Sequence, residues 1–202
     1  MPIDDTLGAQ VRSWAAVAPT PAQQAALRPL IRWIREQEAA DILFVCTHNS
    51  RRSHIAQLWA QAAAHALGVG QVTTWSGGTE ATAFNPRAVR MMRAAGFRLE
   101  GSGEDGNVRY AVSYGDGLPR QVAFSKVYSD PANPQAGFAA VMVCDSADQG
   151  CPVVFGAALR VSLPFVDPKR SDGAPAEAQV YAESGQEIGQ VMAWLMGQAA
   201  KG

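Results

Sequence analysis

The sequence predicts an α/β fold with a doubly wound, mainly parallel central sheet of flavodoxin-like topology. Two apolar runs, residues 41–46 and 138–144, have the length of buried strands. Helical patterns alternate with the strand candidates, and parallel strands joined by helices produce this architecture. With 202 residues, of which 48% are hydrophobic, the chain is long enough to bury one sizeable core.

Residues 1–40 are expected to form an N-terminal helical extension packed on the core domain, residues 41–202. Helical patterns at about 5–17 and 21–39 are separated by two prolines. The second pattern has an apolar stripe at helical spacing, formed by Leu27, Leu30, Ile31 and Ile34. We expect this stripe to pack on the surface of the domain; a dimer contact is the alternative.

The core domain begins with strand 41–46 and a helix that ends near Leu67, because Gly68 and Gly70 follow it. The later elements are a strand at about 72–76, a helix from Pro86 to Gly96, strands at 138–144 and about 159–163, and a last helix at about 176–198. Residues 101–138 interrupt this alternation. Inside them, the alternating segments 108–114 and 121–127 flank a Gly-Asp-Gly turn and predict a β-hairpin, which joins the sheet or lies across it. Its role as an edge extension, a lid or a partner surface stays open.

The strongest chemical signal is the segment from Cys46 to Ser53, Cys-Thr-His-Asn-Ser-Arg-Arg-Ser, between a strand and a helix. The backbone N–H groups of such a loop and the free N–H groups of the helix start can bind an anion. The same field favours the thiolate of Cys46. Arg52 offers a planar fork for two oxygens of a tetrahedral anion, and Ser53 can cap the helix or donate to the sulfur. Together these residues favour an oxyanion pocket with a nucleophile over a buried structural cysteine beside two solvated arginines.

The rest of the loop is expected to bind the substrate, through Thr47, His48, Asn49, Ser50, Arg51 and Ser53. The segment resembles the low-molecular-weight protein tyrosine phosphatases and the arsenate reductases sharing their fold, which carry Cys-x5-Arg-Ser/Thr here. The resemblance continues in Ser76-Gly-Gly-Thr-Glu80, Asn85-Pro86 and Asp167-Pro168, and so covers roughly residues 41–198. It implies that Asn49 braces the loop and that 101–138 is an insertion relative to compact members.

Two loop positions depart from the family pattern. His48 stands where glycine is usual, and histidine is among the residues that tolerate positive φ. Arg51 stands where many members have a second cysteine, and adds positive charge near the anion unless it points to solvent. Some thioredoxin-coupled members hold a potassium ion through an acidic residue where this chain has Gln57, so we expect no such ion. His54 and His65, on the same helix, are expected at its surface without a role.

Asp167 is the predicted general acid and base. The resemblance implies this role for an aspartate before proline, because the leaving oxygen of a tetrahedral oxyanion needs a proton. Phe165 beside it is expected to exclude water. Asp172 and Asp145 are weaker alternatives, and an ordinary Asp-Pro turn is the structural interpretation.

Cys144 and Cys151 separate the two branches of the family. Cys144 ends strand 138–144 and should lie at the carboxyl edge of the sheet, where such folds bind ligands. The segment 144–151 resembles the redox segment of thioredoxin-coupled arsenate reductases. If helical, it would hold the two Cα atoms about 10 Å apart, whereas a disulfide requires about 7 Å, so oxidation would have to unwind it. Two buried structural cysteines, or half of a metal site, are the alternatives, and the spacing disfavours zinc.

The resulting hypothesis is an arsenate reductase that uses Cys46, Cys144 and Cys151 in a thiol relay, with no tightly bound cofactor and thioredoxin as reductant. A small thiol as reductant remains possible. The alternatives are a tyrosine phosphatase, which needs only Cys46, Arg52 and Asp167, and a non-catalytic redox sensor. A net charge of −1 gives no general attraction to nucleic acid or membranes, and three cysteines without a recognisable signal peptide favour a cytoplasmic protein.

Overall fold

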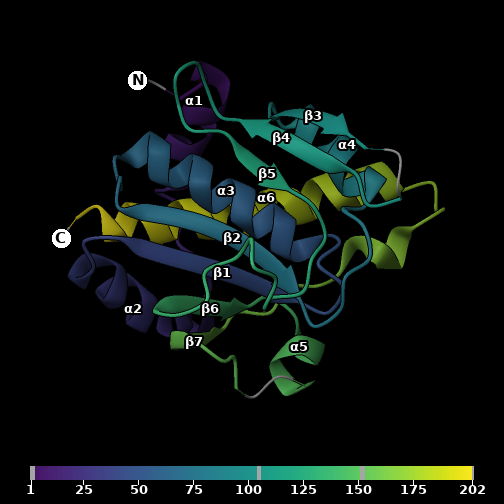
Figure 1. The fold of residues 1–202 in the computed structure, drawn as a ribbon. Helices are drawn as coiled ribbons and strands as arrows, with labels where there is room; N and C mark the ends of the chain where they lie inside the picture. The colour runs from purple at the N-terminus through teal and green to yellow at the C-terminus, as the bar shows by residue number, and fades with distance from the viewer. Residues whose placement is uncertain (1–2, 104–105, 151–152, 202) are drawn as a thin grey trace.

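A computed structural model describes residues 3–103, 106–150 and 153–201. Its central sheet has four parallel strands in the order β2-β1-β6-β7 (Figure 1). The strands are β1 Ala40–Cys46, β2 Val72–Gly78, β6 Phe138–Met142 and β7 Ala157–Ser162. The chain adds β2 on one side of β1 and β6 on the other, so the strand order reverses between β1 and β6. This confirms the predicted α/β class with a parallel sheet, and places the switch point at the carboxyl ends of β1 and β6.

Helix α3, Arg52–Leu67, begins directly after the loop that follows β1. It packs against β1, β2 and the C-terminal helix α6, Glu177–Ala199. Its residues 53–64 are all buried, which its small alanines permit at close approach. The helix ends at Gly68, which adopts φ +74°, the left-handed conformation that glycine reaches without strain. The predicted helix end is therefore correct.

The two N-terminal helices are α1, Asp5–Trp14, and α2, Pro21–Glu36. Helix α1 packs against α3 and α6, and α2 packs against α6 and β7. The apolar stripe of α2 is buried, as expected, at Leu27, Leu30, Ile31 and Ile34. Both helices end about three residues before the predicted positions. For α2 the reason is that Gln37 is already extended, ahead of β1.

The inserted region forms a separate antiparallel sheet in the order β3-β4-β5, with β3 Arg98–Ser102, β4 Arg109–Ser113 and β5 Gln121–Ala123. The predicted hairpin therefore exists as β4 and β5. Strand β3 was not predicted, because its largely exposed residues show little strand periodicity. Residues 124–127, expected to continue the second strand, instead run beside β2 and form a parallel bridge between Val127 and Gly78.

The remaining elements frame the carboxyl edge of the central sheet. Helix α4, Pro86–Ala94, starts at the Asn85 cap, whose side chain accepts from the backbone N–H of Arg87. Helix α5, Asp145–Gly150, follows β6, and a short 3-10 helix η1, Pro168–Ser171, precedes α6. In the described part of the chain, no helix combines the length and apolar character needed to span a bilayer.

Candidate active site

Cys46 lies buried at the end of β1, and its thiol contacts the first turn of α3. The Sγ atom is 3.1 Å from Ser53 Oγ, and the same hydroxyl accepts a 2.8 Å hydrogen bond from the Asn49 amide. Because Asn49 supplies the donor in that second bond, the proton of Ser53 is free to point at the sulfur. A hydroxyl that donates to sulfur stabilises the thiolate, the nucleophilic form of cysteine.

Asn49 sets the shape of the loop. It is the single non-glycine residue with clearly positive φ, 44°, among the residues that the structure describes. Asparagine tolerates this conformation better than most side chains. Its Oδ1 accepts a 2.9 Å bond from the backbone N–H of Lys126. The expectation that the loop needs positive φ at His48 is wrong: the requirement falls one residue later, where asparagine also braces the loop as expected.

The segment after β2 supports the loop through its backbone. The N–H groups of Thr79 and Glu80 donate to the carbonyls of Cys46 and Thr47, at 3.1 and 2.8 Å. Gly78 lies so close that an added Cβ would stand 2.6 Å from the Thr47 carbonyl oxygen. The Gly-Gly-Thr part of the predicted motif thus lets the backbone of this segment approach the backbone of the loop closely.

A second support comes from the insertion, together with Thr82 of the segment after β2. The Ser125 hydroxyl and the Thr82 hydroxyl both donate to the carbonyl of His48, at 3.0 and 3.1 Å. Together with the contact between Lys126 and Asn49, this ties the loop to residues 125–126. Sequence analysis missed these residues. Their separation of 77 positions from the loop leaves no local signal that could have identified them.

Arg52 and Asp167 meet beside the loop. The Arg52 guanidinium donates to the carbonyl of Phe165 at 3.0 Å and to Asp167 Oδ2 at 2.7 Å. Its Nε is buried and has no partner among the described residues. Because an oxyanion needs the same donors, it would compete with Asp167 for Arg52 and could also accept from Nε. The structure therefore brings together the predicted fork and the predicted acid.

Arg51 turns away from the thiol. Its Nε donates to the Tyr181 hydroxyl at 2.7 Å, and its terminal nitrogen lies 2.8 Å from Asp172 Oδ2. Tyr181 in turn donates to Asp172 at 2.7 Å. Tyr181 on α6 and Asp172 directly after η1 thus hold the Arg51 side chain, and its predicted contact with substrate stays a prediction. Burial alone would raise the pKa of Asp172. The contacts with Tyr181, Arg51 and Arg87 outweigh burial and lower this pKa, which disfavours Asp172 as a proton donor.

Cys144 is fully buried directly before α5, and its Sγ accepts from the backbone N–H of Ala147 at 3.3 Å. The same sulfur is 3.5 Å from Thr47 Oγ1, a side chain of the catalytic loop. Strands β1 and β6 are neighbours, so the second thiol lies beside the first loop, as predicted. Both Cys46 and Cys144 are free thiols. Cys151 lies outside the described residues.

His54 also differs from its predicted position. It is completely buried rather than at the surface, 3.1 Å from Ser76 Oγ and stacked on Phe84 with ring centroids 4.0 Å apart. Burial, and then the charge of Lys126, lower its pKa well below the ordinary value, so the ring is neutral. His54 therefore holds α3 against β2 and carries no charge near the loop. The sequence gave no sign of this, because residues 53–64 of α3 are buried on every side, including the polar ones.

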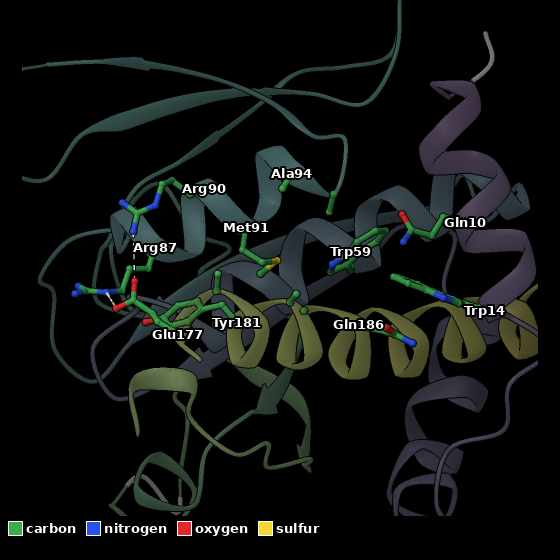
Figure 2. A pocket seen from close by; sticks show the side chains of 14 residues that line it. Gln10, Trp14, Trp59, Arg87, Arg90, Met91, Ala94, Glu177, Tyr181 and Gln186 are labelled. Atoms are coloured by element: carbon green, nitrogen blue, oxygen red, sulfur yellow. Dashed lines mark hydrogen bonds and ion pairs between the residues drawn. The ribbon is translucent and has the colours of Figure 1, made fainter. Parts of the chain in front are cut away.

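A largely apolar cavity of about 490 Å³ lies between α4 and α6, with Trp14 and Trp59 at one end (Figure 2). At its other end Arg87 donates to Glu177 at 2.7 Å, and Arg90 lies 3.5 Å from the same carboxylate. Neither Cys46 nor Arg52 lines this cavity, so it is separate from the loop. In the described ranges, no three His, Cys, Asp or Glu side chains gather as metal ligands would.

Residues 41–106 match the family model described as low molecular weight phosphotyrosine protein phosphatase. A phosphatase of that class from T. tengcongensis has 19% identity over 76% of this chain and 95% of its own, with a TM-score of 0.50. The domain has the low-molecular-weight phosphatase fold. The YwlE arginine phosphatase has 18% identity over 80% of this chain and 93% of its own, again with a TM-score of 0.50.

Proteins described as arsenate reductases are also among the structural neighbours of this phosphatase-fold chain. One from Archaeoglobus fulgidus has 18% identity over 75% of this chain and 98% of its own, with a TM-score of 0.48. A search of curated proteins gives no match. At these identities the similarities concern the fold, and they assign no activity to this chain.

Proposed function

We propose that the protein is an arsenate reductase working through a thiol relay. The observation that supports this choice is the contact between Cys144 Sγ and Thr47 Oγ1, at 3.5 Å. It places a second thiol against the loop of the first. A hydrolytic phosphatase has no use for that thiol, whereas reduction of an oxyanion needs two electrons, which two thiols supply when they form a disulfide.

In the first step, arsenate binds to the loop backbone and Arg52, displacing the Asp167 carboxylate from the guanidinium. The Cys46 thiolate attacks arsenic, an S–As bond forms, and one As–O bond breaks. Asp167, released beside the substrate, takes up a proton from solvent and passes it to this oxygen, which leaves as water. Arg52 Nε, buried without a partner, provides a further donor for the bound anion.

In the second step, the Cys144 thiolate attacks Cys46 Sγ. A Cys46–Cys144 disulfide forms, the S–As bond breaks, and its electron pair stays on arsenic, which leaves as arsenite. The N–H of Ala147 at 3.3 Å stabilises the attacking thiolate. The two thiols have then lost two electrons and arsenic has gained two.

In the third step, Cys151 attacks Cys144, the disulfide moves to that pair, and Cys46 is freed. A dithiol reductant of the thioredoxin class then reduces the Cys144–Cys151 disulfide. The cycle needs all three thiols reduced at its start, which fits a reducing, cytoplasmic setting.

The test is arsenate-dependent NADPH oxidation with thioredoxin and thioredoxin reductase. The parent is compared with Cys144→Ser, Cys151→Ser and, as a matched control at an exposed position of the same segment, Gln149→Ala. We expect turnover in the parent and the control, and none in either cysteine variant. Parent-like turnover in Cys144→Ser would rule out the relay. Replacement of thioredoxin by glutathione or mycothiol tests whether a small thiol serves instead.

A second candidate is phosphoester hydrolysis, as in the matched phosphatase family. Cys46, Arg52 and Asp167 form a complete set for it, with Asp167 2.7 Å from Arg52. The measurement is hydrolysis of p-nitrophenyl phosphate by the same variants. If the parent hydrolyses this ester but does not turn over arsenate, and Cys144→Ser is unchanged, the protein is a phosphatase with a bystander thiol.

A further inference from the structure

A second cavity lies where the insertion covers α3 and the edge strand β2, and it has a volume of about 470 Å³. Figure 1 shows β5 passing in front of α3, and the Gln121 amide joins the two by donating to Gln61 Oε1 at 3.2 Å and to the Thr74 carbonyl at 2.9 Å. Its lining includes Gln57, Gln61, Trp75, Arg109, Phe124 and Lys126. This volume is in the range of small-molecule sites.

The cavity carries an excess of positive charge. Arg109, Arg120 and Lys126 line it, and none of its described lining residues is a carboxylate. Arg120 lies 3.6 Å from Glu100 in an exposed pair, and Asp130 attracts Lys126 without forming an ion pair. The charge balance of the lining therefore favours an anion.

Lys126 is the central group of this charge. The residue is 4% exposed, and its ammonium has no hydrogen bond or ion pair within the described part of the chain. The ammonium lies over the Phe124 ring, with Nζ 4.6 Å from the ring centroid. The Arg109 guanidinium carbon is 3.9 Å from the same centroid. Because an ammonium has three donors and a ring face satisfies none of them fully, Lys126 retains donors for a ligand.

Gln57 supplies the complementary acceptor. Its amide nitrogen donates to the Thr74 carbonyl at 3.3 Å, while its Oε1 is buried without a partner in the described residues. The cavity lining thus contains a buried cation with unused donors and a buried oxygen with unused acceptor capacity. An inorganic anion without a hydroxyl group would accept from the Lys126 ammonium but would leave Gln57 Oε1 without a donor.

We propose that this cavity binds a small organic anion that also carries a hydroxyl group, with the acid group on the Lys126 ammonium and the hydroxyl donating to Gln57 Oε1. The acid group is a carboxylate or a phosphate, since an ammonium does not discriminate between their shapes. The site is separate from the Cys46 loop and does not depend on the reaction that the loop catalyses. The two are nevertheless linked, because the backbone N–H of Lys126 holds Asn49.

The experiment is isothermal titration calorimetry with three probes: citrate, glycerol 3-phosphate and sulfate. The first two carry a hydroxyl, one with carboxylates and one with a phosphate; sulfate has no donor. We expect citrate or glycerol 3-phosphate to bind about tenfold or more tightly than sulfate, and to show which acid group is preferred. Arg52→Ala removes the fork of the catalytic loop and should leave this binding intact.

Lys126→Met should weaken binding of the preferred probe about tenfold or more, and Gln57→Leu should reduce its advantage over sulfate. Lys201→Met, at another of the chain's lysines, is the matched control and should bind like the parent. Thermal unfolding of each variant confirms that it is folded. Arg109→Gln, at an exposed position, should independently weaken binding of the preferred probe by a few fold. Binding that Arg52→Ala abolishes and Lys126→Met leaves unchanged belongs to the loop and would overturn the proposal. So would no binding by either hydroxyl-bearing probe.

Discussion

The ends of β1 and β6 lie side by side, with buried Cys46 as the last residue of β1 and buried Cys144 two residues after β6, yet the chain secures the two ends differently. After Cys46, carbonyls of the loop accept hydrogen bonds from residues 79–80, from Asn85 and from Ser125, all distant in sequence. After Cys144, the nearest support is local, from the N–H groups of Ala147 and Asp148. Long-range contacts therefore hold the first end in place.

The second end is easier to rearrange. Helix α5 has six residues, and its main tie to the sheet is Asp148, which accepts from Arg160 at 2.6 Å and from Ser162 at 2.7 Å. A thiol that must change partners during a relay suits such an end, because unwinding one short helix breaks few contacts. The two strand ends therefore differ in how they are held: distant segments brace the first, and its own short helix holds the second.

Cys46→Ser would give the largest effect. Both arsenate turnover and p-nitrophenyl phosphate hydrolysis should fall by at least about a thousandfold, because each requires this nucleophile. Steady-state kcat/KM for both substrates is the measurement. Cys144→Ser, at the other strand end, should remove the first activity only. Retention of either activity in Cys46→Ser would break the assignment of the nucleophile.

Gly78→Ala tests the bracing of the first end. Its Cβ would stand 2.6 Å from the Thr47 carbonyl oxygen and 2.7 Å from the Asn49 nitrogen, so the loop must move. A displacement of about 1 Å costs on the order of a hundredfold in rate, and overpacking costs about 1–3 kcal/mol of stability. Gly70→Ala is the control, since no atom lies within 4 Å of its added Cβ. Equal activity of the two variants would mean that the loop is not rigidly held.

The sequence was sufficient to predict the features that local pattern encodes. Apolar runs located strands β1 and β6, and the spacing from Cys46 to Ser53 located the loop, whose identity as a phosphatase-type loop came from resemblance. Cys144 could be placed beside it because parallel strands share one carboxyl edge. These predictions required only periodicity, strand direction and a continuous motif.

Other features depend on contacts between distant residues, and no local pattern encodes them. The place of the Arg51 side chain, for example, is set by Tyr181 on α6 and Asp172 after η1, both far from it in sequence. His54 is buried because α1, α6, β1 and β2 pack around α3, with Ser76 and Phe84 against the imidazole ring. The loop brace at Ser125 could not be predicted either, since its hydroxyl matters only once residues 124–127 leave the β-hairpin.

Lys126→Met tests how much stability the protein loses by burying the Lys126 ammonium beside the loop support at residues 125–126. Burial, partly offset by Asp130, lowers the pKa of Lys126 from 10.5 to about 8. Between pH 8 and pH 10.5 the unfolded state then binds more protons than the folded state, so the stability of the parent rises with pH across this window. Below pH 8 the folded protein bears the full destabilisation from burying a charged ammonium. At about 1.4 kcal/mol per pH unit, the variant should be more stable by up to roughly 3 kcal/mol at pH 7.

Urea unfolding at pH 7 and pH 10.5 measures this difference, which should shrink at the higher pH. Lys201→Met is the control and should match the parent at both values. A variant less stable than the parent at pH 7 would mean that the ammonium stabilises the folded state, and that the brace does not bury an uncompensated charge.

Asp148→Asn tests the local support of α5 after Cys144 and should have the smallest effect. The amide keeps the size of the carboxylate but loses its charge, so the contact with Arg160 weakens by up to about 1 kcal/mol. A less stable α5 unwinds more readily, and disulfide formation by Cys144 and Cys151 should become about two- to fivefold more favourable. Equilibration in glutathione redox buffers, followed by alkylation and mass spectrometry, measures this constant. Asp145→Asn, at the exposed first residue of α5, is the matched control. If both variants keep the parent's constant, unwinding of α5 does not limit the thiol exchange, and the local support after Cys144 has no part in the relay.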